Sequence, residues 1–162
     1  MIDAAKLIRY NIWANRRLTE QTKCLSNELF TKELGGSFPS IQLTLRHLVE
    51  SDWIWMHRWK GISFVDVPST WSIHDAPSLL STWYPIQNQI EEIVSHRTAQ
   101  PNDEVVFTTR KGDSFSLPFV DTVMHSTNHG TYHRGQVVNM LRMLGEKPVN
   151  TDYFIFCTVS GT

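Results

Sequence analysis

Apolar side chains recur every three or four residues in four long stretches of the chain, which is the period of an amphipathic α-helix. Asp3 is placed to cap the first stretch, and Gly61 and Gly145 are placed to end the second and the last. Pro85 inside the third stretch indicates either a kink or a later start of that helix. The pattern predicts helices over residues 3–24, about 37–60, about 75–97 and 118–144.

The period changes to two between the third and the fourth predicted helix. Residues 104–109 and 113–117 alternate β-branched or aromatic side chains with polar ones, on either side of a turn near Lys111 and Gly112. This pattern predicts a small antiparallel hairpin. Because two strands alone are only marginally stable, we expect the hairpin to lean on the helices as a lid or a brace.

The remaining segments lack a helical period. Residues 26–38 carry two adjacent glycines and read as a connecting loop, residues 62–75 are irregular, and residues 100–103 form a break. The apolar tail at residues 152–157 is expected to pack as an extended segment over the helices or at a subunit contact. Four helices with long connections predict an all-α protein. The expected fold is a four-helix bundle with a small β-hairpin between its third and fourth helices, in one domain of residues 1–162.

Composition and charge argue against several classes of function. Lys and Arg number 15 against 16 Asp and Glu, so the chain has no overall positive charge to attract nucleic acid. The apolar runs are too short to span a bilayer and the first residues lack the pattern of a signal peptide, so we expect a cytoplasmic protein without membrane contact. Cys24 and Cys157 form no metal or disulfide pattern, and we expect each to be a small core residue.

Three histidines lie four residues apart in the last predicted helix, at His125, His129 and His133. Four residues turn a helix by about 400°, so each imidazole is about 40° round from the previous one and the three share one stripe. Imidazole is the most common metal ligand among side chains, and an i, i+4 pair lets one helix offer two ligands to one ion. The alternative is a polar helix face that carries histidines without a metal.

A third ligand has to come from another helix, and His47 in the middle of the second predicted helix is the candidate. A lone histidine on an apolar helix face is more often a hydrogen-bonded core residue. Three neutral nitrogens would leave coordination positions open, as in catalytic sites, and would suit a divalent ion such as zinc or nickel. Asp52 follows in the same helix, either as an acceptor for an imidazole N–H or as a solvated carboxylate.

The segment from His125 to Gln136 resembles the signature of the DinB family, the bacterial DinB/YfiT-like proteins described as metalloenzymes. The combination of His125 with the run Asn-His-Gly-Thr-Tyr-His-Arg-Gly-Gln is specific. Two further stretches are similar to the family pattern, YNIWANRR at residues 10–17 and HLVESDW at residues 47–53. The resemblance covers nearly the whole chain.

The resemblance implies a four-helix bundle of unusual up-and-down topology, often dimeric, with a divalent ion held by three histidines. Carried over position by position, the metal ligands are His47, His129 and His133. His125 lies outside the usual ligand set and is expected to support a ligand or to face the substrate. The same is expected of Tyr132, Arg134, Gln136 and Asp52, although a surface ion pair for Arg134 and a backbone cap for Gln136 are the alternatives.

Relatives in the wider superfamily imply an enzyme that activates a low-molecular-weight thiol, as an S-transferase, or water, as a hydrolase. The alternative is a non-enzymatic stress-response protein with a structural or sensory metal. In that case the tryptophan cluster at residues 53–59 would be the partner surface, and His125 would supply a fourth ligand. We expect a homodimer that takes a small-molecule substrate, and the sequence leaves the reaction itself open.

Overall fold

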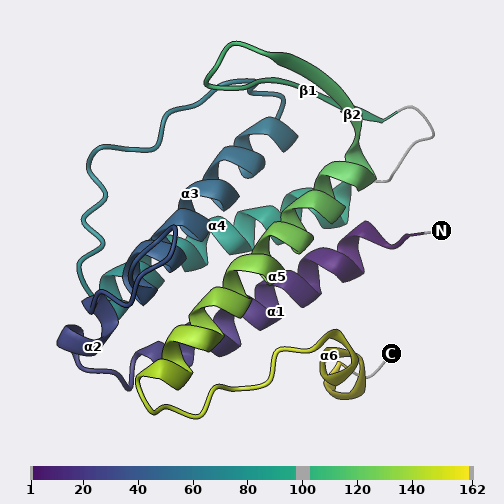
Figure 1. Cartoon of the computed structure of the whole chain (residues 1–162). Helices are drawn as coiled ribbons and strands as arrows, with labels where there is room; N and C mark the ends of the chain where they lie inside the picture. Colours follow the sequence, from purple (N-terminus) through teal and green to yellow (C-terminus); the bar gives the residue numbers. More distant parts are fainter. Residues whose placement is uncertain (1, 98–102, 161–162) are drawn as a thin grey trace.

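The computed structural model describes residues 2–97 and 103–160. Four long helices form a bundle, and a two-stranded antiparallel hairpin lies across one end of it (Figure 1). The elements in chain order are α1 (Ala4–Thr22), α2 (Asn27–Thr31), α3 (Ile41–Trp59), α4 (Ala76–His96), β1 (Glu104–Thr108), β2 (Ser114–Pro118), α5 (Phe119–Met143) and α6 (Tyr153–Val159). The predicted four-helix bundle with a hairpin before its last helix is confirmed. With the short α2 counted, the hairpin lies between α4 and α5.

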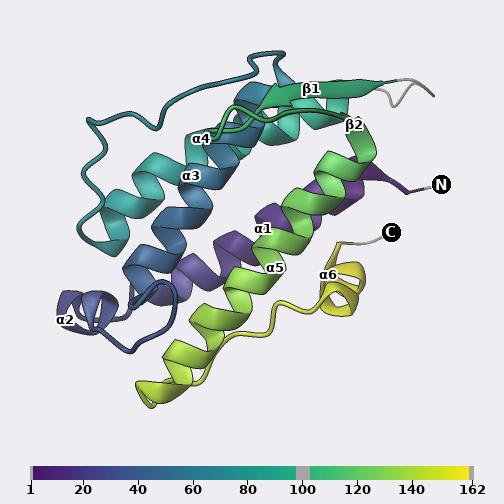
Figure 2. The same cartoon turned by 45° about the horizontal axis from the view of Figure 1, so that its top comes forward.

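The long helices form a ring in which α1 contacts α4 and α5, and α3 contacts the same two helices. Helices α3 and α4 run in the same direction, and α1 and α5 run in the opposite direction (Figures 1 and 2). Two parallel neighbours cannot be joined by a short turn. Residues 60–75 therefore return along the length of the bundle before α4 begins (Figure 1).

The ends of the helices follow the capping residues of the sequence. Asp3 Oδ1 accepts from the Lys6 amide at the start of α1, and Asp75 and Ser78 form a reciprocal capping box at the start of α4. Helix α4 therefore begins at Ala76 rather than later near Pro85, and it continues through this proline. No helix within the described ranges is long and apolar enough to cross a lipid bilayer.

The hairpin leans on α3, as predicted. Phe107 of β1 is buried, and its ring centroid lies 5.2 Å from that of Trp55. The Thr108 amide donates to Ser63 Oγ over 2.8 Å, which ties β1 to the chain that leaves α3. The turn of the hairpin falls at the expected place, with Gly112 at a φ of +90° that favours glycine.

Three local predictions were wrong. The segment predicted as a loop contains α2, because Ser26 caps the Leu29 amide and Phe30 gives the short helix a buried anchor. The tail predicted as extended forms α6, whose Phe156 is buried against Tyr10. Cys24 is exposed and is not a core residue. The break predicted at residues 100–103 lies, apart from its last residue, outside the described residues.

Helices α1 and α5 approach each other closely around a buried guanidinium. Arg134 Nη1 donates to Asn11 Oδ1 (2.5 Å) and to Asn15 Oδ1 (2.8 Å), and Nη2 donates to Thr131 Oγ1 (2.8 Å). A Cβ atom at Gly130 would collide with Asn11 Oδ1 and would lie 2.7 Å from Arg134 Nη1. Gly130 therefore makes room for the network that joins the two helices.

Gly130→Ala is expected to lower the free energy of unfolding by about 1–3 kcal/mol, because the added methyl group displaces buried polar partners. Gly135→Ala is the matched control in the same helix, since a Cβ there meets nothing within 4 Å. It is expected to raise the free energy of unfolding by about 0.5–1 kcal/mol through helix propensity. Chemical denaturation followed by circular dichroism measures both, and equal effects of the two substitutions would contradict this role of Gly130.

Candidate metal centre

Three histidines from two helices meet on the inner side of the bundle. His47 lies in the first half of α3, and His129 and His133 lie on either side of the middle of α5, which runs the opposite way. One ring nitrogen from each residue can be chosen so that the three atoms lie within 4.8 Å of one another. The ring centroids are 4.5 Å apart for His129 and His133, and 5.0 and 4.7 Å apart for His47 with these two.

The donor atoms fit a divalent cation. Nε2 of His129 is buried and has no hydrogen-bond partner, which is costly for a polar atom unless a ligand satisfies it. Nδ1 of His133 lies 2.7 Å from Gln136 Oε1. Because that oxygen can only accept, the proton belongs on Nδ1 and the lone pair on Nε2, the arrangement in which a metal-binding imidazole is commonly held.

Burial and nearby imidazoles favour the neutral form of His129 and His47. Burial lowers the pKa of His129 to about 4, and the nearby His133, His47 and His125 contribute to the same shift. Burial, and then the neighbouring His133, also lower the pKa of His47. Neutral imidazole is the form that binds a metal ion. His129 and His47 can thus bind a cation at neutral pH without first losing a proton.

His125 lies beside this group rather than in it. Its ring stacks on that of His129 at a centroid distance of 6.0 Å, and its centroid lies 5.3 Å from that of Trp55, with the two rings tilted by 57°. Within the described part of the chain, the group of side chains that could hold an ion consists of His47, His129 and His133. His125 thus contacts the group through the ring of His129, and its supporting or substrate-facing role stays a prediction.

The other residues of the predicted site divide into two groups. Gln136 contacts the site through His133, and Tyr132 is exposed with its ring 5.1 Å from that of His133. Arg134 is buried in the contact between α1 and α5, so neither the substrate-orienting role nor the surface ion pair describes it. Asp52 is also buried, and its Oδ2 accepts from Trp83 Nε1 over 2.7 Å instead of from an imidazole.

A pocket of about 280 Å³ opens beside the histidines. His47 and His129 form part of its wall, and the rest of the wall is not among the residues that the sequence suggested. These further residues are Glu50, Ser51, Ile54, Trp55, Arg58 and Arg110. Five of them follow His47 in α3 at steps of 3, 4, 7, 8 and 11 residues, which is the spacing of one helix face. That spacing could have identified these five pocket residues from the sequence. Arg110 comes from the hairpin turn, and no spacing in the sequence connects it with the pocket.

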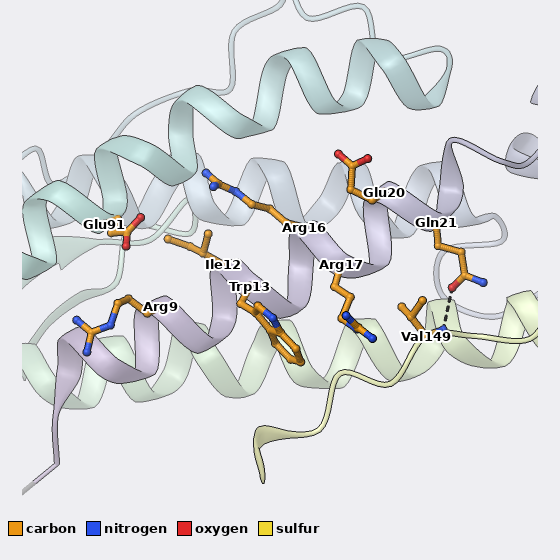
Figure 3. Close-up of a pocket in the computed structure, with 9 residues that line it drawn as sticks. All are labelled: Arg9, Ile12, Trp13, Arg16, Arg17, Glu20, Gln21, Glu91 and Val149. Carbon is orange, nitrogen blue, oxygen red and sulfur yellow. Dashed lines mark hydrogen bonds between the residues drawn. The ribbon is translucent and has the colours of Figure 1, made fainter. Parts of the chain in front are cut away.

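A second pocket lies elsewhere, along α1, and measures about 750 Å³ (Figure 3). Its polar side chains are largely engaged with the protein itself. Arg16 donates to Gln87 and Asn88, and Gln21 accepts from the Val149 amide over 2.9 Å (Figure 3). The smaller pocket beside the histidines is the better functional candidate, because unpartnered donor atoms and perturbed pKa values gather there.

Comparison with known proteins places this chain in a family. The DinB family model matches residues 1–160. The chain is also similar to Protein DinB of Bacillus subtilis (strain 168), with 30% identity over 174 aligned residues that cover 98% of this chain and 96% of the relative. The chain belongs to the DinB family. Its membership agrees with the resemblance of the His125–Gln136 segment and with the three-histidine group in the fold.

Asp52 of this DinB-family protein gives a pH-dependent prediction. Burial raises the pKa of Asp52 from its ordinary value of 3.8 to about 6, while the hydrogen bond from Trp83 and the charge of Arg134 oppose the shift. The protonated carboxyl is thus favoured in the folded state. Its contribution to stability is present below about pH 4 and is lost as the pH rises through 6.

Asp52→Asn keeps the acceptor oxygen for Trp83 and removes the ionisation. The variant is expected to be more stable than the wild type at pH 8, by about 2–3 kcal/mol, and the two should converge near pH 4. Denaturant unfolding at several pH values measures the difference. A stability difference that stays constant from pH 4 to pH 8 would show that Asp52 is not an ionising buried acid.

Proposed function

We propose that the chain is a divalent-metal-dependent enzyme in which His47, His129 and His133 hold the ion and the adjacent pocket takes a small substrate. The observation that carries the proposal is that the three histidines offer one ring nitrogen each within 4.8 Å of one another, while Nε2 of His129 is buried without a partner. Zinc and nickel both suit a site of three imidazole nitrogens. Three protein ligands leave room for a further, exchangeable ligand, which is typical of catalytic sites.

When bound, the ion would lower the pKa of a small thiol or of water and so supply the nucleophile for an S-transferase or a hydrolase reaction. The residues around the site prepare it for that chemistry. Gln136 fixes the tautomer of His133, and the ring of Phe38 stacks on that of His47 at 4.4 Å and shields it on one side. These contacts hold the imidazoles in place before a ligand arrives.

The pocket wall offers an apolar surface to the substrate and a carboxylate that can accept a proton. Ile54 and Trp55 give it an apolar side, and Glu50 gives it a carboxylate one helical turn after His47. A carboxylate at the edge of such a site can accept the proton that the nucleophile loses. We assign that task to Glu50.

A structural or sensory metal is the competing function, and two features argue against it. His125 packs against Trp55 and lies outside the three-histidine group. Two of the three tryptophans in the cluster that would serve as a partner surface are also buried, since Trp55 is 6% exposed and Trp59 is 4% exposed, and Trp53 is half-buried. Homodimer formation and cytoplasmic location stay predictions from the sequence.

The first test is metal analysis of purified protein after reconstitution with zinc or nickel and removal of excess ion. The wild type is expected to retain about one ion per chain, and His47→Ala, His129→Ala and His133→Ala are expected to lose it. His96→Ala is the matched control, because His96 is exposed at the end of α4. Full retention of the ion by His47→Ala would refute the ligand set.

The second test is turnover of the metal-loaded protein. Bacillithiol, mycothiol and glutathione are each supplied with an electrophilic acceptor, and an ester substrate is supplied without thiol. We expect thiol-dependent turnover with at least one thiol, and a loss of at least about 100-fold in His47→Ala, because several kcal/mol of stabilisation are removed. Ester hydrolysis without thiol dependence would favour water as the nucleophile, and the absence of both activities would favour a binding protein.

A further inference from the structure

Arg58 lines the pocket beside the histidines and is held there by aromatic rings. It lies eleven residues after His47, or about three turns along the same face of α3. Its Cζ lies 4.7 Å from the ring centre of Trp55 and 4.2 Å from that of Phe107, distances typical of cation–π contacts. The hairpin thus clamps the guanidinium against α3 from the β1 side.

The charge of Arg58 is not matched by the protein. Its Nε is buried without a hydrogen-bond partner, and burial lowers the pKa of the guanidinium. Among the described residues, Arg46 pairs with Glu50 and Arg97 pairs with Asp103, but Arg58 forms no ion pair. A partly buried cation without a partner is unfavourable unless a ligand supplies the opposite charge.

Arg110 adds a second cation to the same pocket. It lies in the hairpin turn, it is exposed, and it likewise forms no ion pair with a described residue. Glu50 is the acidic residue of the pocket wall, and its Oε1 already accepts from Arg46 Nε over 3.0 Å. Two arginines against one engaged carboxylate give the pocket a net positive charge before any metal ion is counted.

We propose that Arg58 and Arg110 form an oxyanion subsite, which binds a carboxylate or phosphate group of a small organic substrate. Guanidinium groups bind such anions through paired, charge-assisted hydrogen bonds. Ile54 and Trp55 contact the carbon skeleton of the substrate, and its opposite end faces His47 and His129. This orientation rests on the proposed function, whereas the subsite itself does not. The pocket volume of about 280 Å³ suits a small organic anion.

The subsite is tested in protein stripped of metal with a chelator, so that an anion cannot bind through an ion. Benzoate and phenyl phosphate are the anionic probes, and benzamide is the uncharged probe of similar shape. Binding is followed by NMR, through the side-chain Nε–Hε signals of the arginines. The wild type is expected to bind an anionic probe at least about tenfold more tightly than benzamide. The tighter of the two anions identifies the group that the subsite takes.

Substitutions of Arg58 and Arg110 test whether these two side chains bind the anion. Arg58→Gln and Arg110→Gln are each expected to weaken binding of the preferred anion by at least about fivefold, and Arg58→Lys is expected to lie between wild type and Arg58→Gln. Arg142→Gln is the control, because it removes the same charge from an exposed position near the end of α5. Arg110 is exposed in a turn, so its variant tests the subsite even if Arg58→Gln does not fold.

Three results would overturn the proposal. The first is equal binding of the anions and benzamide by the wild type. The second is that Arg110→Gln and a folded Arg58 variant bind the preferred anion as tightly as Arg142→Gln does. The third is the absence of saturable anion binding up to roughly 10 mM. Metal retention by the histidines is measured separately, so a failure of the subsite and a failure of the metal site can be told apart.

Discussion

The antiparallel packing of α3 on α5 is the constraint on which the candidate site depends. Trp59 Nε1 donates to Thr122 Oγ1 over 2.9 Å, which joins the end of α3 to the start of α5 inside the core. With this end fixed, the first half of α3 must lie beside the middle and the second half of α5. His47 consequently meets His129 and His133, although more than eighty residues separate them in the chain. A shift of one helical turn, about 5.4 Å, would separate the three nitrogens.

The surrounding structure makes this register rigid. On one side, the buried Arg134 joins α5 to Asn11 and Asn15 of α1, at a place where only glycine fits at position 130. On the other side, the hydrogen bond between Asp52 and Trp83 joins α3 to α4. Both are buried polar contacts, which favour one packing arrangement over its neighbours because an unpaired partner would be costly. Polar residues that the sequence suggested for chemistry thus serve to position the helices that carry the ligands.

The sequence predicted what depends on local spacing. The helix period gave the four long helices, the alternation at residues 104–117 gave the hairpin, and the four-residue spacing of His129 and His133 gave two imidazoles of the candidate site. The place of His47 in the second predicted helix made it a candidate, and the resemblance to the family assigned it as a ligand and set His125 apart. Arg134 and Asp52 were misjudged because their partners lie on other helices, and their burial is decided by tertiary packing that a single sequence does not display. Arg110 was missed for the same reason, since the place where a hairpin turn lands depends on how the strands lean on α3.

The central claim is that three histidine nitrogens, without His125, hold one ion and leave a position open. X-ray absorption spectroscopy of the zinc-loaded protein counts the imidazole ligands directly, in the wild type and in His125→Ala. The account predicts three imidazole nitrogens in both proteins, with the remaining coordination completed by an exchangeable ligand. Four imidazoles in the wild type and three in His125→Ala would contradict it and would identify a closed, structural metal site.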